Sequence, residues 1–207
     1  MSAYLIYEHL ERIANLMRTD IRKSGIAHGL QPVQLEALHY LSRCNRYSNN
    51  PVAVAEFLGL TKGTVSQSLR VLEKSGLISR LADGVDKRRF HLSLSAEGHA
   101  VIAKTHPPAV LKKAVEEAPA EFLAETERVL NQVLRRLQAA NSLKSFGVCK
   151  TCHHHATDER GNRHCQLTGE DLSDEDAVLL CREHQPPAGE PTELELSSPR
   201  TSQSEAV

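Results

Sequence analysis

Apolar residues recur every three or four positions over most of residues 1–145, which is the spacing of amphipathic helices. The spacing changes to a two-residue alternation in one short region, and the helical pattern stops beyond Ser145. The predicted helices cover residues 2–24, about 33–43, 52–58, 62–74 and a long stretch over 96–142 that is broken at Pro107-Pro108 and restarts at Pro119. This pattern predicts a mainly α-helical chain.

Residues with strong capping preferences stand at the ends of these predicted helices. Asn50 is a good N-cap, and Pro51 after it fits the first position of a helix. Thr61 and Ser95 are expected to cap the helices that follow them. The Ser24-Gly25 pair predicts the end of the first helix.

The alternating region predicts a β-hairpin. Residues 90–94 alternate between apolar and polar side chains, and residues 77–81 are also strand-like. The segment between these runs is polar and contains Gly84, as a hairpin turn does. A helix, a turn, a second helix and a hairpin over residues 51–94 form the order of a winged helix-turn-helix. The expected fold class is therefore mainly α with a small β-hairpin wing.

The helix over residues 62–74 has an outer face suited to DNA. With Val65 at the centre of the buried face, steps of 100° per residue place Gln67 and Arg70 outside. Gln can pair with adenine and Arg with guanine, while lysines and the free N–H groups at a helix start bind phosphate. The candidate DNA-binding residues are Lys62, Thr64, Ser66, Gln67, Arg70 and Lys74 in this helix and Lys87, Arg88 and Arg89 at the hairpin tip.

Charge is distributed unevenly along the chain. The net charge is +7 over residues 1–150 and −8 over residues 151–207, although the whole chain carries only −1. Within residues 43–89, nine Lys and Arg residues stand against four Asp and Glu residues. A concentrated basic segment indicates a polyanionic partner, but many solvated faces are basic and the signal is weak by itself.

Residues 52–98 resemble the core of the MarR (multiple antibiotic resistance regulator) family, most specifically over residues 60–98. The family's helix ending, Leu-Glu-x-x-Gly-Leu-Ile, is matched by residues 72–78, and its strand-to-helix ending, Leu-(Ser/Thr)-x-x-Gly, by residues 94–98. Its wing pattern is matched by Asp83, Asp86, Lys87 and Arg88. Val85 and Lys87 stand where Arg is common in the family, so the residue that enters the minor groove is left open. The resemblance extends over roughly residues 1–145.

The resemblance implies a dimeric transcriptional regulator, most readily a repressor. Its helices over 2–24 and 96–142 would form the homodimer, which would read a pseudo-palindromic operator in double-stranded DNA. The family's peroxide sensors carry a reactive cysteine in the first helix, whereas residues 1–43 contain none. Cys44 is expected to be a small core residue. A small-molecule effector is compatible with the sequence, which identifies none.

Four of the five cysteines fall within residues 149–181, outside the region of the resemblance. Two ligands separated by two residues can hold one ion from a single tight turn, as in Cys149/Cys152 and Cys181/His184. In a reducing cytosol such a cluster indicates a metal more often than disulfides. The candidate ligands are Cys149, Cys152, Cys165, Cys181 and His184.

The identity of the metal and the fourth ligand stay open at this point. The two pairs favour Zn²⁺ slightly, but they leave Cys165 unused. Use of all four cysteines also suits an iron–sulfur cluster (2Fe-2S or 4Fe-4S). The run of residues 153–155, three histidines, is expected to be an exposed polar stretch.

Three regions follow from these patterns. Residues 1–145 form a MarR-like domain, residues 146–184 a metal-binding segment, and residues 185–207 a disordered tail rich in Pro, Ser and Glu. No apolar run is long enough for a membrane span and the N-terminus lacks a secretory signal, so we expect a cytoplasmic protein. The sequence contains no recognisable catalytic motif, and an enzyme is not expected. The alternative is a metalloenzyme or redox protein whose helix-turn-helix docks a partner.

Overall fold

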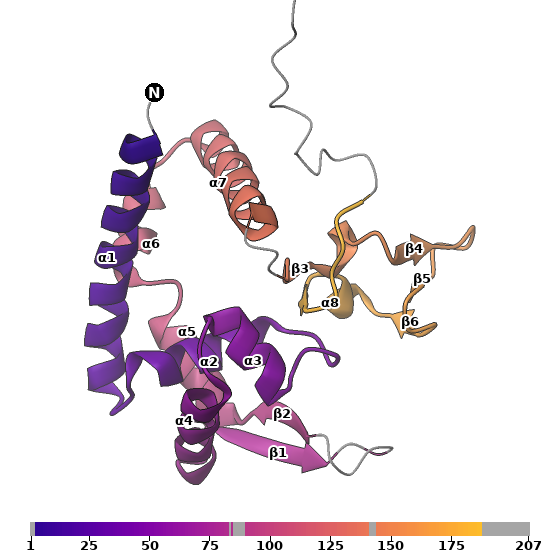
Figure 1. Ribbon diagram of the computed structural model, residues 1–207, viewed down its shortest axis with the longest axis horizontal. Helices are drawn as coiled ribbons and strands as arrows, with labels where there is room; N and C mark the ends of the chain where they lie inside the picture. The colour runs from indigo at the N-terminus through magenta and orange to yellow at the C-terminus, as the bar shows by residue number, and fades with distance from the viewer. Residues whose placement is uncertain (1–2, 83, 85–89, 141–143, 188–207) are drawn as a thin grey trace, which may run out of the picture.

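The computed structural model joins a winged helix-turn-helix to a small C-terminal unit (Figure 1). It describes residues 3–82, 84, 90–140 and 144–187. The N-terminal part contains α1 (Ala3–Ala27), α2 (Pro32–Arg43), α3 (Pro51–Leu58), α4 (Lys62–Lys74), β1 (Ile78–Ala82), β2 (Phe90–Leu94), α5 (Ala96–Thr105), α6 (Ala109–Val115) and α7 (Ala120–Ala140). Residues 144–187, here called the cysteine module, contain β3 (Gly147–Val148), the 3₁₀ turn η1 (Cys149–Thr151), β4 (His155–Thr157), β5 (Arg163–Cys165), β6 (Asp171–Leu172), α8 (Asp174–Ala177) and β7 (Leu180–Cys181). The predicted class, mainly helical with small antiparallel sheets, is confirmed.

The core lies where α2, α3, α4 and the β1–β2 hairpin meet. Leu38 of α2 and Leu69 and Leu72 of α4 are fully buried there, and Leu92 of β2 closes the cluster. Each such side chain stabilises the fold by about 1.5–3 kcal/mol through its removal from water. Because the apolar stripe of α4 is used in this way, its opposite face is left to solvent.

Side-chain caps fix where the helices of the winged part begin, as predicted. The Asn50 side chain accepts a hydrogen bond from the Ala53 amide at 3.0 Å, ahead of α3. Thr61 and Ser95 cap α4 and α5 in the same way. Each cap satisfies one of the amides that a helix start leaves unpaired, which typically contributes about 1 kcal/mol.

The first helix is longer than the sequence predicts. The prediction ended it at Ser24-Gly25, but α1 continues to Ala27 and the chain turns at Gly29, whose φ is +68°. Gly25 serves a close approach instead of a helix end, since a Cβ at this position would lie 2.8 Å from the Leu30 carbonyl oxygen. The first hairpin strand is also displaced by one residue, because the Leu77 amide bonds to the Leu72 carbonyl oxygen as part of the C-terminal cap of α4.

The two proline sites divide the long helical stretch as predicted. Interruptions of the helix at Pro107-Pro108 and before Pro119 separate α5, α6 and α7. In Figure 1, α6 lies along α1, and the Asp20 carboxylate accepts a hydrogen bond from the Val110 amide at 3.2 Å. α7 contributes no buried residue, so its apolar positions remain exposed.

The cysteine module consists of two very small sheets. β3 pairs antiparallel with β7, and β4, β5 and β6 form a three-stranded antiparallel sheet. Sheets of this size are marginal by themselves. The module packs on the winged part through Phe146, which lies in the main core with ring centroids 5.9 Å from Tyr40 and 5.2 Å from Phe57. Phe146 has a φ of +46°, a left-handed conformation that costs a non-glycine residue about 1–3 kcal/mol and that this packing offsets.

No helix in the described part of the chain is both long and apolar enough to cross a membrane. The predicted disordered tail lies outside the described residues from position 188 onward.

The pH dependence of stability can be predicted from His39 of α2, whose ring stacks on that of His106 at a centroid distance of 4.2 Å. Burial, with His106 and Arg43 nearby, lowers the pKa of His39 to about 4, against about 6.5 in an unfolded chain. As pH falls from about 6.5 to about 4, the unfolded chain gains a proton that the folded chain resists. The free energy of unfolding should therefore fall in this window, by about 1–2 kcal/mol because solvent partly screens the half-buried ring.

His39→Gln should flatten this decline in urea unfolding followed by circular dichroism. His99→Gln, an exposed histidine in α5, is the control and should leave the decline unchanged. An equally steep decline in wild type and His39→Gln would contradict the assignment.

Candidate functional site

The outer face of α4 is polar and exposed. Lys62, Thr64, Gln67, Arg70 and Lys74 are exposed as predicted, while Ser66 is half-buried. In Figure 1, α4 and the β1–β2 hairpin lie together at one end of the molecule. The face is therefore presented next to the wing.

The first residues of α4 and its cap are exposed to solvent. The Thr61 side chain caps the Thr64 amide at 3.2 Å and also lies 3.0 Å from the Thr64 hydroxyl. This contact orients the Thr64 side chain, because its hydroxyl interacts with the hydroxyl of the capping residue. The N-terminal end of a helix carries a partial positive charge that favours anions, and Lys62 adds a full charge there.

The wing is a regular antiparallel hairpin at its base. Ile78 pairs with Leu94, and the register continues to Ala82 opposite Phe90. Arg80 of β1 forms an ion pair with Glu73 of α4 at 3.1 Å, which joins the wing to the helix. The predicted tip residues Lys87, Arg88 and Arg89 lie outside the described residues, as do Asp83, Val85 and Asp86.

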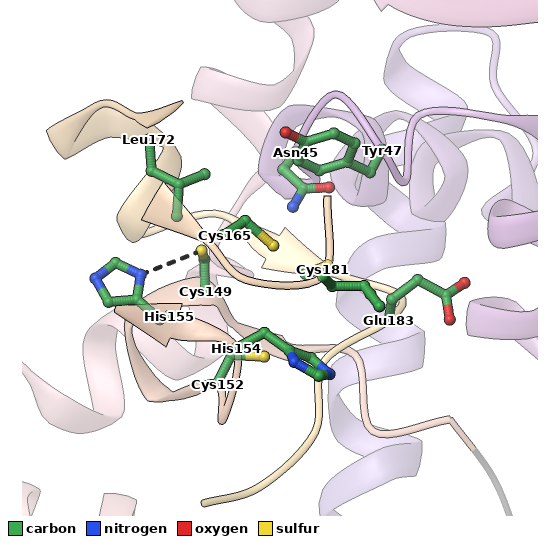
Figure 2. Close-up of a pocket in the computed structure, with 11 residues that line it drawn as sticks. Asn45, Tyr47, Cys149, Cys152, His154, His155, Cys165, Leu172, Cys181 and Glu183 are labelled. Carbon is green, nitrogen blue, oxygen red and sulfur yellow. Dashed lines mark hydrogen bonds between the residues drawn. The ribbon is translucent and has the colours of Figure 1, made fainter. Parts of the chain in front are cut away.

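The four C-terminal cysteines surround one small cavity, although up to 32 positions separate them in the chain (Figure 2). Its free volume is about 20 Å³. Cys149 and Cys152 come from the η1 turn, where the Cys152 amide bonds to the Cys149 carbonyl oxygen at 3.0 Å. Cys165 and Cys181 come from β5 and β7. All five cysteines of the chain are free thiols, and Cys44 is a buried core residue as predicted.

Two of the thiols at this cavity, those of Cys149 and Cys181, are held in their neutral form. Burial raises the pKa of Cys149 to about 11, with further contributions from the other three cysteines. Burial also raises the pKa of Cys181, while hydrogen bonds with Asn45, the Glu183 backbone and Ser48 work in the opposite direction. A cation in the cavity would reverse this balance, because thiolates are the form that binds metal. Across the residues described, however, no three His, Cys, Asp or Glu side chains already stand in a metal-binding arrangement.

Two histidines at the cavity correct the sequence prediction. The run of residues 153–155 was expected to be exposed, but only His153 is; His154 and His155 are half-buried and line the cavity. The His155 Nδ1 atom lies 3.5 Å from the Cys149 sulfur. Residue 155 belongs to β4, which pairs with β5, and this pairing turns the ring inward.

His184 lies apart from the cavity. Its Nδ1 atom is 2.9 Å from the Ser145 hydroxyl, and its Nε2 atom is 3.0 Å from the Thr151 hydroxyl. The buried ring packs on Gly147, where a Cβ would come within 2.5 Å of it. Both ring nitrogens are thus used to hold the two ends of the cysteine module together.

Sequence reasoning missed the residues that close the cavity from the winged part. Asn45 and Tyr47, from the loop between α2 and α3, reach over the cysteines (Figure 2). They stand about 100 positions before Cys149, and no spacing rule connects them to it. Their position at the cavity is visible only in the folded structure.

Comparison with known proteins finds similarity in the winged part of the chain. Residues 28–89 match the model of the MarR family. The transcriptional regulator HosA from Escherichia coli O127:H6 (strain E2348/69 / EPEC) is 34% identical over 86 residues, which are 42% of this chain and 62% of HosA. HosA from Escherichia coli O111:H- is 32% identical over 89 residues, 43% of this chain and 64% of that protein. The matches thus span less than two thirds of the length of these relatives.

Solved structures share the fold at lower identity. CouR from Rhodococcus jostii RHA1, bound to p-coumaroyl-CoA, aligns with a TM-score of 0.52 and 20% identity over 62% of this chain and 90% of its own. A MarR-family transcriptional regulator from Rhodococcus sp. RHA1 aligns with a TM-score of 0.53 and 18% identity over 64% of this chain and 94% of its own. These likenesses show the fold of the winged part and its flanking helices.

The packing of Phe146 predicts that the module depends on the core of the winged part. Phe146→Ala should lower the free energy of unfolding by about 3–5 kcal/mol, because it leaves a cavity beside Tyr40 and Phe57. Phe90→Ala removes a ring that is 40% exposed and should cost clearly less. Urea unfolding measures both, and equal losses would show that Phe146 is not a core residue.

Proposed function

We propose that this chain is a DNA-binding transcriptional regulator of the MarR family that acts as a homodimer and a repressor, and whose C-terminal cysteines hold a metal. The observation that carries the DNA-binding part is the exposed polar face of α4 beside the hairpin wing. The match of residues 28–89 to the MarR model and the names of the matched regulators support the same conclusion.

In this proposal α4 lies in the major groove. Gln67 and Arg70 read base edges, with Thr64 and Ser66 at the flank. Lys62, Lys74 and the amides at the start of α4 bind phosphates, which fix position without reading sequence. The wing residues Lys87, Arg88 and Arg89 reach the backbone or the minor groove next to it.

A second copy of the chain is the proposed cover for the apolar faces of α1 and α7. The exposed large apolar side chains of these helices are Tyr4, Leu5, Ile6, Tyr7, Ile13, Leu16 and Ile26 in α1 and Phe122, Val129, Leu130, Leu134 and Leu137 in α7. An apolar surface of this extent is typical of an interface. A twofold dimer places two α4 helices on half-sites about one helical turn apart, on a pseudo-palindromic operator. Occupation of such an operator excludes other proteins from it, which is the simplest form of repression.

The proposed metal ligands are Cys149, Cys152, Cys165 and Cys181. All four cysteines line one cavity, and four thiolates are a ligand set that closed tetrahedral Zn²⁺ sites use; a free volume of about 20 Å³ favours a single ion over a four-iron cluster. A bound ion stabilises the thiolates and supplies folding free energy to the module. His184 then supports the site from outside, since its ring nitrogens hold Ser145 and Thr151.

Sequence-specific binding should depend on Gln67 and Arg70. Gln67→Ala and Arg70→Ala should each weaken binding to an operator selected from a random duplex pool by about 1–3 kcal/mol, with little change on a scrambled duplex. Lys113→Ala, in α6 away from this face, is the control and should bind both duplexes like wild type. Fluorescence anisotropy at fixed salt measures the affinities, and wild-type operator binding by both variants would refute the placement of the recognition face.

Metal binding should require the four cavity cysteines but not the fifth. Cys149→Ser/Cys152→Ser and Cys165→Ser should lose stoichiometric metal from anaerobically purified protein, because each removes a thiolate ligand. Cys44→Ala is the matched control and should keep it, and His184→Gln should keep it as well. Elemental analysis gives the stoichiometry, and the visible spectrum separates colourless Zn²⁺ from an iron–sulfur cluster. Retained metal in the double variant would overturn the ligand assignment.

A further inference from the structure

Besides Phe146, the cysteine module contacts the winged part through one loop, residues 44–50, which joins α2 to α3. The Asn45 amide donates to the Leu180 carbonyl oxygen at 2.9 Å, and the Arg182 amide donates to the Ser48 hydroxyl at 2.8 Å. These two hydrogen bonds flank Cys181 in the sequence. The Asn45 side chain also lines the cavity together with Cys181.

Ion pairs also join the cysteine module to the loop and to α3. The Arg182 guanidinium binds both carboxylate oxygens of Glu56 in α3, at 2.6 and 2.7 Å. Arg46 in the loop binds Glu170 at 2.8 Å and Asp176 at 3.3 Å, both in the module. Two-point guanidinium–carboxylate contacts define orientation as well as distance. The module is therefore held in one orientation relative to α3.

The far end of the loop is bonded to the DNA-binding elements. The Leu92 amide of β2 donates to the Asn49 carbonyl oxygen at 2.7 Å, and the Asn49 side chain lies 2.7 Å from the His91 ring. Asn50 caps α3, the first helix of the helix-turn-helix. Seven consecutive residues thus contact a cavity cysteine at one end and the wing and α3 at the other.

We propose that residues 44–50 couple occupancy of the cysteine centre to the geometry of the DNA-binding surface. This inference rests on the proposed function. An occupied centre fixes Cys181, and through it Leu180 and Arg182, against Asn45, Ser48 and Glu56. The loop then holds α3 and β2 in the arrangement described here, which pre-organises α4 and the wing for DNA. An empty centre releases β7, and the loop loses these partners. The occupied protein therefore binds its operator more tightly.

The experiment measures a coupling factor, the ratio of operator Kd for chelator-stripped protein to that for Zn²⁺-loaded protein. The wild-type factor should be at least about 5, the lower end of usual allosteric coupling. Arg46→Gln/Glu56→Gln breaks both ion-pair contacts but removes no proposed metal ligand or base-reading residue. Its factor should fall to within about twofold of one, with stoichiometric Zn²⁺ retained. Any direct effect of these charges on DNA cancels in the ratio.

Glu125→Gln/Arg128→Gln is the matched control, because it breaks an exposed ion pair within α7 and makes the same change in charge. Its factor should equal that of wild type. If Arg46→Gln/Glu56→Gln loses Zn²⁺, Tyr47→Phe replaces it. This change removes the hydroxyl that donates to Glu170 at 2.6 Å and accepts from Arg46 at 3.0 Å and from Thr168 at 3.4 Å. Its factor should then be lower than that of wild type.

A second measurement needs no variant. Coupling of equilibria is reciprocal, so saturating operator should raise the affinity of the wild-type protein for Zn²⁺ by the same factor. A wild-type coupling factor of one would overturn the coupling and leave the proposed function intact. The same holds if Arg46→Gln/Glu56→Gln, or Tyr47→Phe in its place, binds Zn²⁺ and keeps the wild-type factor. Absence of operator binding, or of Zn²⁺ binding, by the wild-type protein would overturn the proposed function and this inference with it.

Discussion

The burial of the loop between α2 and α3 is the constraint on which the rest of the structure depends. Loops usually lie in water, but Ser48 is fully buried and Asn45 is only 3% exposed. A buried backbone must pair its polar groups or lose about 1–3 kcal/mol for each one. Here the pairing comes from other elements, as when the Tyr40 hydroxyl donates to the Ser48 carbonyl oxygen at 2.9 Å. The loop therefore folds only together with the parts that satisfy it.

The cysteine module supplies several of those partners, and this makes it part of the protein's core organisation. Phe146 fills a site between α2 and α3, and Leu180 forms a bridge to Cys44. The module in turn is too small to stabilise its own sheets. A bound ion and the contacts to the loop would then stabilise the same strands from opposite sides. This is why the state of the cysteines and the position of α3 are difficult to separate physically.

The winged part depends on local signals to a much greater degree. Caps at Asn50, Thr61 and Ser95 fix the starts of three helices, and the apolar stripe of α4 fixes which side faces solvent. The polar face proposed to read DNA follows from that stripe, because a helix can bury only one side here. In the proposed function, DNA binding also depends on the arrangement of α3, α4 and the wing, and the loop is hydrogen-bonded to β2 through Asn49 and to α3 through Asn50.

The sequence by itself determined the features that rest on contacts between near neighbours. These are the helix periodicity, the caps, the hairpin and the exposure of Gln67 and Arg70. It also identified a group of cysteines as candidate metal ligands, because their clustering is visible in the sequence. It placed the end of the first helix at Ser24-Gly25, since glycine signals a stop locally, whereas the real role of Gly25 is the approach of the Leu30 carbonyl five residues later.

Only the tertiary structure decided which side chains share the cysteine cavity. It brought Cys165 to the cavity and left His184 outside, although both spacings were compatible with a ligand. It turned His155 inward through the β4–β5 pairing, and it placed Asn45 over a site about 100 positions away. Such contacts depend on how separate elements pack, and the residues that make them carry no periodic signal. The local pattern therefore specified the elements, and long-range packing specified the site.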